Sequence, residues 1–440
     1  MVTTRMVTTR MVTTRMVTTK RSHPLNPIFP WNEPIPTRGA APLLVDETLR
    51  DGIQSPSVRN PNALEKAQLL RLMARSGVST ANIGLPGAGG QAVADAVRLA
   101  RAISVEKLPI APQCAARTHI ADLDAVAEVA ARSGVEIETC AFVGASGVRR
   151  LVEGWSLDHI RGLVERTGRR LAYHGLPFTF VTEDTIRTDP ETLDVLFRTA
   201  IDCGATRLVI CDTAGYATRS GLHRLYAFVR GLIQETGCAV ELDWHGHDDR
   251  GLSLALAIEA AQLGFDRVHG TILGIGERVG NTPMDLLILN LYLDGALKTW
   301  PEGLREYVYS VSELMEAPIA RDYPAFGADA FRTATGVHAA AIEKALAAGE
   351  PELADRVYSA VPARELGLKH NIEVGYYSGR ANAVGWLRYR NLEVSPARID
   401  VIMALAKTCC RTLTAPAITH ALRDAGLLGT KDKPVAANNG

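Results

Sequence analysis

Apolar and polar residues follow one repeating pattern along the chain between residues 43 and 271. Each repeat has a short apolar run, then a loop rich in Gly, Pro or Asp, then a segment with apolar residues at helical spacing. The apolar runs, which we predict to be strands, are Leu43–Val45, Thr80–Gly84, Leu108–Cys114, Glu136–Phe142, Pro177–Val181, Arg207–Cys211, Val240–His245 and Arg267–Thr271. The predicted helices between them are Ala63–Ser76, Ala92–Ile103, Ala121–Ser133, Ser156–Gly168, Pro190–Asp202, Arg219–Thr236 and Leu252–Leu263.

Glycine indicates where several of these helices end, because the residue after a helix often has a positive φ. Gly77, Gly134, Gly204 and Gly264 stand at such positions. Strand–helix units repeated in this way over about 250 residues have the size and order of a (β/α)8 TIM barrel, an α/β fold. A doubly wound parallel sheet is the alternative, but it usually has fewer strands, and no GxGxxG motif follows the first apolar run.

We predict three parts in the chain. Residues 1–40 contain MVTTR three times, then MVTTK, then a proline-rich strap, and we interpret them as a disordered tail, with a transit peptide as the minor interpretation. Residues 41–300 form the predicted barrel. Residues 301–440 lose the repeating pattern and are predicted to be a helical subdomain, with helices over Gly303–Met315, Ala339–Ala348 and Pro396–Thr412 joined by irregular stretches.

Composition narrows the class of protein. The chain has 440 residues, 47% of them hydrophobic and 22% charged, as in soluble globular proteins. Its 48 basic and 48 acidic residues give no argument for a nucleic-acid or membrane-surface partner. No apolar run approaches the roughly 20 residues of a membrane-spanning helix. Seven cysteines without a CxxC motif favour a reducing compartment, so a cytoplasmic location is expected.

Polar clusters follow the predicted strands at their carboxyl ends, where TIM barrels carry their active sites. These clusters are Asp46–Gln54, Ser146–Arg150, Thr182–Asp184, Asp212–Thr213, His245–His247 and Gly274–Asn281. His245 and His247 are two residues apart, so on a strand they point to the same face and can bind one divalent metal ion. Solvated histidines at a strand end are the alternative. Asp51 can add an oxygen ligand, and Arg50 can hold an oxyanion beside it.

Three motifs together resemble the DRE-TIM metallolyase superfamily, and within it the branch of 2-isopropylmalate synthase and homocitrate synthase. They are Arg50-Asp51-Gly52-Ile53-Gln54, His245-Gly246-His247, and the loop Gly274-Ile-Gly-Glu-Arg-Val-Gly-Asn281. The resemblance covers about residues 43–380 and implies a metal-dependent condensation of acetyl-CoA with a 2-oxo acid that gives a 2-hydroxy-2-carboxymethyl acid and CoA. The metal could be Mg, Mn, Zn or Co.

The resemblance also implies roles for individual residues. Asp51, His245, His247 and Asn281 would be the metal ligands. Arg50 would polarise the keto oxygen, with Glu183 near the acetyl group. Gln54, Ser146, Arg150 and Thr213 would bind the 2-oxo acid. The loop with Gly274, Gly276, Glu277 and Arg278 would receive acetyl-CoA. His338, assisted by Tyr358, would be a base that reaches the barrel of a neighbouring subunit, so a homodimer is expected.

Two departures from the family pattern bear on the substrate. The family has a glutamate on the second strand that supports the arginine, whereas this chain has Asn82. We expect Asn82 to accept a hydrogen bond from Arg50 and to leave the site more positive by one charge. Homocitrate synthases have an arginine at the position of Arg150, where it meets a distal carboxylate; a solvated arginine is the alternative. Both departures favour an anionic 2-oxo acid, such as 2-oxoglutarate, oxaloacetate or a phosphono- or phosphinopyruvate, over a branched one.

Two other function classes remain open. A lyase of the hydroxymethylglutaryl-CoA type shares the barrel and the metal site, but that branch has a cysteine in the loop after the eighth strand, and residues 271–281 here contain none. A catalytically silent barrel that acts as a binding protein would be consistent with Asn82 alone.

Overall fold

The computed structural model describes residues 31–32 and 41–429. Eight parallel strands form a closed barrel in sequence order, with β1 also pairing with β8. The strands are β1 (Leu43–Asp46), β2 (Thr80–Asn82), β3 (Ala111–Arg117), β4 (Glu138–Gly144), β5 (Phe178–Glu183), β6 (Ala205–Asp212), β7 (Glu241–Gly246) and β8 (Arg267–Gly270). The predicted TIM barrel is confirmed, and the doubly wound sheet is excluded because the sheet closes. The predicted tail and most of the strap lie outside the described residues.

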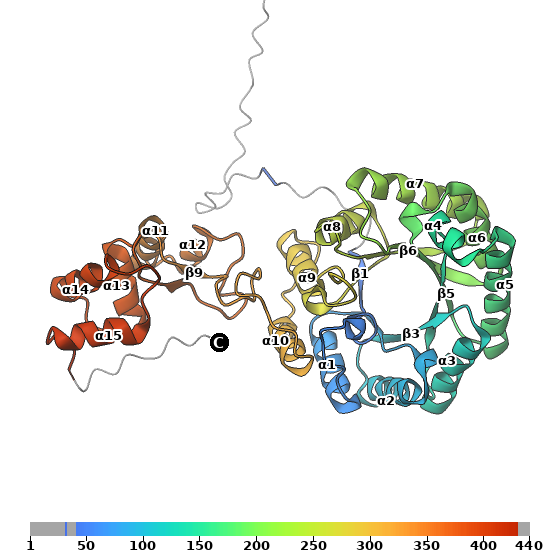
Figure 1. The fold of residues 1–440 in the computed structure, drawn as a ribbon, viewed down its shortest axis with the longest axis horizontal. Helices are drawn as coiled ribbons and strands as arrows, with labels where there is room; N and C mark the ends of the chain where they lie inside the picture. The colour runs from blue at the N-terminus through green and yellow to red at the C-terminus, as the bar shows by residue number, and fades with distance from the viewer. Residues whose placement is uncertain (1–30, 33–40, 430–440) are drawn as a thin grey trace, which may run out of the picture. The chain divides into compact units, whose positions relative to one another are not determined.

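Helices surround the barrel of strands (Figure 1). They are α1 (Ala63–Arg75), α2 (Gly90–Glu106), α3 (Ile120–Ser133), α4 (Gly147–Glu153), α5 (Leu157–His174), α6 (Pro190–Asp202), α7 (Arg219–Thr236), α8 (Ser253–Leu263), α9 (Met284–Leu293) and α10 (Leu304–Leu314). Four one-turn 3₁₀ helices are η1 (Gly52–Gln54), η2 (Pro86–Ala88), η3 (Thr185–Arg187) and η4 (Ile272–Gly274). The glycines predicted at helix ends, Gly77, Gly134, Gly204 and Gly264, all have a positive φ.

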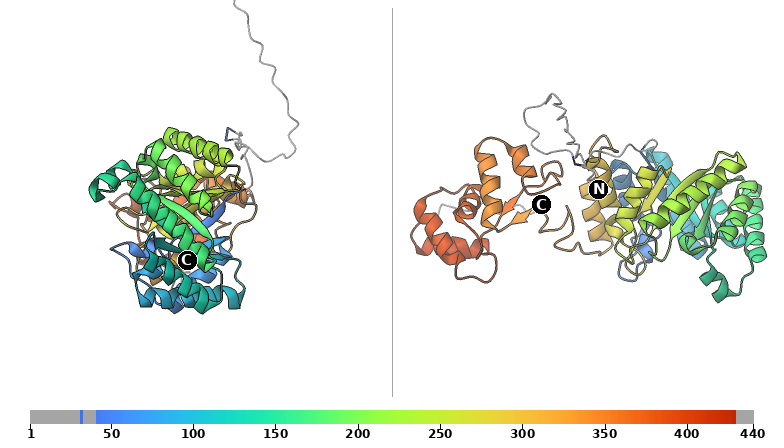
Figure 2. Two further views of the ribbon diagram at one scale, coloured as in Figure 1. Left: turned by 90° about the vertical axis from the view of Figure 1, so that its right-hand side faces the viewer. Right: turned by 90° about the horizontal axis from the view of Figure 1, so that it is seen from above.

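Two of the differences from the sequence prediction have local reasons. The third strand begins at Ala111 rather than Leu108, since Pro109 cannot donate a hydrogen bond to a neighbouring strand. The polar cluster after β4 contains the short helix α4, which Ser146 caps by accepting a hydrogen bond from the N–H of Arg149 at 3.2 Å. Figure 2 shows α4 projecting from the barrel, and Leu151 and Val152 on it are 83% and 75% exposed.

Strand residues alternate between the helix layer and the barrel interior. Leu44, Phe180 and Trp244 are fully or almost fully buried in the apolar core between strands and helices. The interior instead contains charged side chains near the amino ends of the strands. Arg207 Nη1 donates to Asp243 Oδ1 at 2.7 Å, while the guanidinium of Arg267 lies 2.9 Å from a carboxylate oxygen of Glu138. The layer beneath the barrel mouth is therefore ionic.

Residues beyond the barrel form helices with cores of their own. They include α11 (Gly336–Ala347), α12 (Pro351–Arg356), α13 (Arg380–Tyr389), α14 (Pro396–Ala406), α15 (Ala415–Asp424) and the two-residue strands β9 (Arg332–Thr333) and β10 (Asn371–Ile372). The sequence pattern missed α12, α13 and α15, and α14 ends at Ala406 instead of Thr412. Within the part of the chain that is described, no helix is long and apolar enough to cross a membrane.

Candidate active site

Three potential metal ligands meet at the carboxyl ends of β1 and β7. His245 is in β7 and His247 follows it, while Asp51 lies in the turn after β1, and all three side chains are buried. The Nε2 atoms of the two histidines are 3.4 Å apart, and His245 Nε2 is 3.5 Å from Asp51 Oδ2. Their ligand atoms all lie within 4.8 Å of one another, as atoms around one metal ion must.

Neighbouring groups orient these ligands. His247 Nδ1 lies 3.2 Å from the carbonyl oxygen of Gly280, so a proton on Nδ1 leaves Nε2 free to bind a metal. Asn281 donates from its Nδ2 to Ile275 at 3.1 Å, but its buried Oδ1 has no hydrogen-bond partner. A buried oxygen without a partner is costly unless something binds it. The donor set of two imidazoles, a carboxylate and this amide oxygen therefore fits a divalent metal.

Protonation states agree with metal binding. Burial, together with the mutual repulsion of the two imidazoles, holds the pKa of His245 well below its usual value. Burial likewise lowers the pKa of His247. Burial alone would raise the pKa of Asp51, but the adjacent charge of Arg50 helps to hold it below its usual value. Neutral imidazoles and an ionised carboxylate are the forms that bind metals.

A second triad, of Glu47, His245 and His269, lies beside the first and shares His245. Its donor atoms are already used within the protein. His269 Nδ1 is 2.8 Å from Glu47 Oε1, and His269 Nε2 is 3.2 Å from Asp243 Oδ2. Because both imidazole nitrogens have carboxylate partners, this triad is a hydrogen-bonded network and the first triad is the candidate metal centre.

Arg50 lies between two carboxylates at the barrel mouth. Its guanidinium pairs with the carboxylate of Glu47, and its Nη1 is 3.3 Å from Asp51 Oδ2. Asn82, contrary to the sequence-based expectation, does not accept from Arg50 but donates from Nδ2 to Glu47 Oε2 at 3.3 Å. Glu47 therefore supplies a negative charge beside Arg50. The sequence-based expectation that Asn82 leaves the site more positive by one charge did not take this carboxylate into account.

A cavity of about 650 Å³ opens over these residues. Among the predicted site residues, Arg50, Asp51, Gln54, Glu183, Thr213, His245, His247, Glu277 and Arg278 line it. Thr213 accepts a hydrogen bond from the N–H of Asp184 at 2.8 Å. Between the charged groups the lining is neutral, formed by Asn82, Leu85, Ala115, Cys140, Phe142, Val181, Val209 and Cys211.

Ser146 and Arg150 do not line this cavity. Ser146 is fully buried as the cap of α4, and Arg150 Nη1 donates to Thr192 Oγ1 at 2.8 Å and lies 3.9 Å from Asp189 Oδ2. Its neighbour Arg149 extends toward Glu183, with 4.0 Å between Nε and Oε1. The arginine that sequence reasoning assigned to a distal carboxylate is thus engaged at the start of α6.

The loop from Gly274 to Asn281 borders the cavity, which Glu277 and Arg278 line. A side chain at Gly280, whose φ is +90°, would collide with the carbonyl oxygen of Gly274, so this fold of the loop needs glycine there. The N–H of Asn281 donates to the same carbonyl at 2.9 Å. Arg278 is fixed by Asp249 and by the carbonyl oxygen of Thr213, at 3.0 Å and 2.6 Å. The N–H of Gly280 donates to the carbonyl oxygen of Glu277 at 2.9 Å, so a tight turn separates Glu277 from Asn281.

His338 and Tyr358 lie together in the helical region. Their rings stack with centroids 3.8 Å apart, and Tyr358 is 48% exposed. Within the described part of the chain, every residue that lines the barrel cavity belongs to the stretch from Glu47 to Arg278. The chain therefore brings His338 and Tyr358 to each other and not to its own cavity.

Sequence reasoning missed Glu47 and His269 as members of the site. A usable signal was present in the strand periodicity. Asp243, His245 and His247 alternate along one strand, and Arg267 and His269 alternate along the next, which predicts that all of them point to the barrel interior. Glu47 directly follows β1 within the polar cluster Asp46–Gln54, and its role becomes clear only once its neighbours on β2 and β8 are known.

Comparison with known proteins agrees with this geometry. The HMGL-like family model matches residues 41–315. The homocitrate synthase AksA of Methanopyrus kandleri is 29% identical over 83% of this chain and 87% of its own length. A 2-isopropylmalate synthase of Parasynechococcus marenigrum is 31% identical over 83% of this chain and 68% of its own. An HMG-CoA lyase structure from Brucella melitensis covers 63% of this chain and all of that one, with a TM-score of 0.52 and 16% identity, and at that identity it supports the fold alone.

The family match spans more than half of the chain and contains β1 to β8 with all three candidate metal ligands, Asp51, His245 and His247. The synthase relatives extend beyond the barrel, since each aligns with 83% of the chain. The sequence-based predictions of the superfamily and of an enzyme related to these synthases are confirmed. The chain belongs to the HMGL-like family.

Proposed function

We propose that the protein is an acyltransferase that condenses acetyl-CoA with a 2-oxo acid in the presence of a divalent metal; water then hydrolyses the thioester, giving a 2-hydroxy-2-carboxymethyl acid and CoA. The single observation that carries this proposal is the convergence of Arg50 and Asp51 with His245 and His247 in one open cavity. Relatives named as homocitrate and 2-isopropylmalate synthases support the same reaction class.

Asp51, His245, His247 and Asn281 would hold the metal, which when bound acts as a Lewis acid on the keto group of the substrate. Arg50 complements that role, because its guanidinium faces the cavity and can stabilise the alkoxide that forms as the new carbon–carbon bond closes. Mg, Mn, Zn and Co all remain compatible with this mixed nitrogen and oxygen donor set.

Thr213 is suited to bind the substrate carboxylate, since its hydroxyl lines the cavity one strand from the metal ligands. Glu183 lies on the neighbouring strand and is half-buried, a position from which it can contact the acetyl group. Glu277 and Arg278 on the Gly274–Asn281 loop would receive the thioester and its pantetheine arm. Gln54 is exposed at the rim and would contact the substrate from the β1 side.

The side chain of the 2-oxo acid would lie against β2 to β5. Apart from Glu183, the lining from those strands and the residues after them is Asn82, Leu85, Ala115, Cys140, Phe142 and Val181, all uncharged. An anionic substrate would need a cation there, and the engagement of Arg150 with Thr192 takes away the residue expected to supply it. A neutral 2-oxo acid, linear or branched, therefore suits the cavity better than 2-oxoglutarate, oxaloacetate or a phosphonopyruvate.

The proton on the acetyl methyl group needs a base within hydrogen-bond reach. His338, stacked on Tyr358, would supply it from a second copy of the chain, which makes the working enzyme a homodimer with shared active sites. In this arrangement residues 41–300 bind the substrates, and residues 301–440 contribute the base to the partner.

The reaction is tested by release of free thiol from acetyl-CoA with a panel of neutral and anionic 2-oxo acids, with and without a chelator. We expect metal-dependent release with neutral acids. Release with anionic acids alone would overturn the substrate preference, and release that survives chelation would overturn the metal. Cleavage of hydroxymethylglutaryl-CoA, without condensation, would instead identify a lyase.

The shared site is tested by complementation between two inactive variants, Arg50→Ala and His338→Ala. Mixing them and allowing subunits to exchange should restore part of the activity, because hybrid dimers contain one site with both residues intact. A mixture as inactive as its components, with dimers demonstrated by light scattering, would place the base in the same chain as the barrel it serves.

A further inference from the structure

Glu47 is a buried carboxylate, 3% exposed, that contacts polar groups from four different parts of the barrel. One oxygen pairs with the guanidinium of Arg50 and accepts from Asn82 Nδ2 at 3.3 Å. The other oxygen is 2.8 Å from His269 Nδ1 and 3.7 Å from His245 Nδ1. Its backbone N–H donates to Gly270 at 2.9 Å, so the residue is fixed at both ends.

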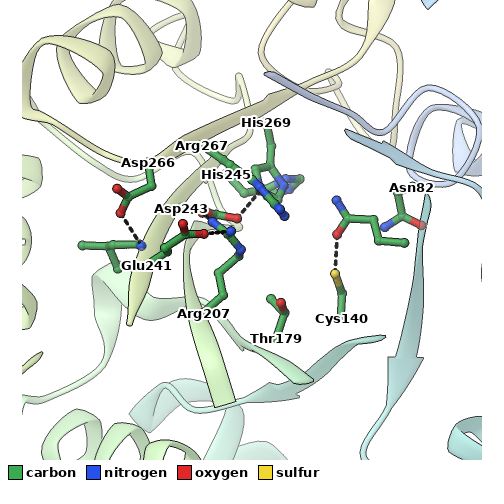
Figure 3. Close-up of polar contacts among 12 residues, drawn as sticks. Asn82, Cys140, Thr179, Arg207, Glu241, Asp243, His245, Asp266, Arg267 and His269 are labelled. Atoms are coloured by element: carbon green, nitrogen blue, oxygen red, sulfur yellow. Dashed lines mark hydrogen bonds and ion pairs between the residues drawn. The ribbon is translucent and has the colours of Figure 1, made fainter. Parts of the chain in front are cut away.

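His269, the partner of Glu47 on β8, is itself hydrogen-bonded to a group deeper in the barrel. His269 Nε2 lies 3.2 Å from Asp243 Oδ2, and the other oxygen of Asp243 accepts from Arg207 at 2.7 Å. Figure 3 shows Arg207, Asp243 and His269 in line within the barrel, with Asn82 on the opposite side of the interior. An ionic column therefore runs from the barrel interior up to Glu47 and ends at Arg50.

Arg50 needs this carboxylate because its other acidic neighbour has a different task. Among the described residues, the carboxylates within 4.0 Å of the Arg50 guanidinium are those of Glu47 and Asp51. Asp51 belongs to the metal triad, so a bound cation competes with Arg50 for its charge. A guanidinium that faces an open cavity has many rotamers, and a second carboxylate fixed from three sides limits them.

We propose that Glu47 is the positioning residue of the site: it holds the Arg50 guanidinium toward the substrate, and Asn82 and His269 orient it for this purpose. The proposal rests on the proposed function in that Arg50 acts on the 2-oxo acid. It also explains why position 82 can hold a neutral residue, asparagine, since Glu47 at the end of the adjacent strand β1 supplies the negative charge.

The test moves the charge from position 47 to position 82. Glu47→Gln removes the charge and keeps the shape. Asn82→Glu adds a carboxylate on β2, at a site whose side-chain nitrogen is already 3.3 Å from Glu47 Oε2. Glu47→Gln/Asn82→Glu therefore restores one carboxylate next to Arg50. Glu47→Gln/Asn82→Gln is the matched control, with the same length and no charge.

In the activity assay, Glu47→Gln should lower kcat by about 10- to 100-fold, as losing a group that orients a functional residue does. The KM for acetyl-CoA should stay unchanged. The charge-moved double variant should recover at least about tenfold of the lost kcat, and the Gln/Gln control should recover none. Equal activity of the two double variants would overturn the proposal.

Unfolding of the metal-free proteins in urea decides the proposal independently of any substrate. Asn82→Glu should destabilise the wild type, where it faces Glu47, and stabilise Glu47→Gln, where it faces an Arg50 with one lost partner. The same sign in both backgrounds would show that position 82 does not share a partner with position 47 and would overturn the proposal. If the wild type condenses no 2-oxo acid, the proposed function fails while this sign reversal still decides the role of Glu47.

Discussion

Removing one imidazole of the metal triad is the most direct perturbation of the candidate active site. His247→Ala is the better choice of the two, because His245 also lies near Glu47 and its loss would disturb the neighbour of Arg50. The ring of His247 contacts His245 and the carbonyl oxygen of Gly280, and its ligand atom lies within 4.8 Å of that of Asp51. A change in metal affinity in this variant can therefore be attributed to the lost ligand.

The magnitude follows from binding linkage. At a free metal concentration of about 100 times Kd, binding to the native state alone adds about 2.7 kcal/mol to the free energy of unfolding. Loss of a partner that orients a metal ligand costs about 10- to 100-fold in affinity, so loss of a ligand itself from this site, with three donor atoms within 4.8 Å, should raise Kd by at least about 100-fold. At the same metal concentration the variant would then gain at most about 0.4 kcal/mol. For a barrel of this size these gains correspond to shifts in Tm of about 5 °C and less than about 1 °C.

The assay is thermal unfolding of chelator-treated protein with and without added Mn²⁺ or Zn²⁺, at several pH values. Because burial holds the pKa of both imidazoles below 6.5, the gain from metal should be nearly constant between pH 7 and 8. His420→Ala is the control, since that side chain on α15 is 79% exposed and pairs with Asp424. An equal metal-induced shift in wild type and His247→Ala would refute the triad as the metal centre.

Three further changes test other parts of the structure. Burial raises the pKa of Asp285 from 3.8 to about 6, so ionisation of this carboxyl destabilises the native state as pH rises through this range. Between pH 4 and 7, the free energy of unfolding of Asp285→Asn in urea should therefore rise relative to that of wild type by up to about 3 kcal/mol. A difference between the two proteins that does not change with pH would contradict this. Gly280→Ala should lower the free energy of unfolding by about 1–3 kcal/mol. Gly154→Ala is the control, because Gly154 also has a positive φ but has open space around it, so its loss should be smaller. Equal losses in the two variants would contradict the predicted collision. Arg150→Ala should change the KM for the 2-oxo acid by less than about tenfold, since Arg150 does not line the cavity; a larger rise would return it to the substrate site.

The barrel could be predicted from sequence because each of its units carries the same local signals. Apolar strands, polar strand ends and glycines after helices agree with one another, and the carboxyl ends of parallel strands must meet at one rim. That geometry alone brings Asp51 and His245 together, although they are far apart in the chain. The sequence signals for the helix α13 are weaker, since Gly385 interrupts its apolar pattern and the burial of the helix depends on packing around Trp386.

Side-chain direction could not be predicted in the same way. Arg149 and Arg150 are adjacent on α4, and sequence places both near the barrel mouth. Whether either of them reaches the cavity depends on the angle at which α4 leaves β4 and on whether a nearby partner such as Thr192 engages it first. Glu47 presented the same difficulty, because its role depends on partners from β2 and β8 that no local pattern identifies.

The ionic interior of this barrel is better explained by orientation than by stability. Burying paired charges often stabilises a protein no more than apolar residues of the same size would, while removing one member of such a pair costs several kcal/mol. Arg207, Asp243 and His269 could be replaced by apolar layers in a barrel that served only as a scaffold. Here their chain of hydrogen bonds leads to Glu47, and Glu47 forms an ion pair with Arg50. A rigid column of this kind fixes the angle of one guanidinium over the metal triad, and an apolar core has no directional contact with which to do so.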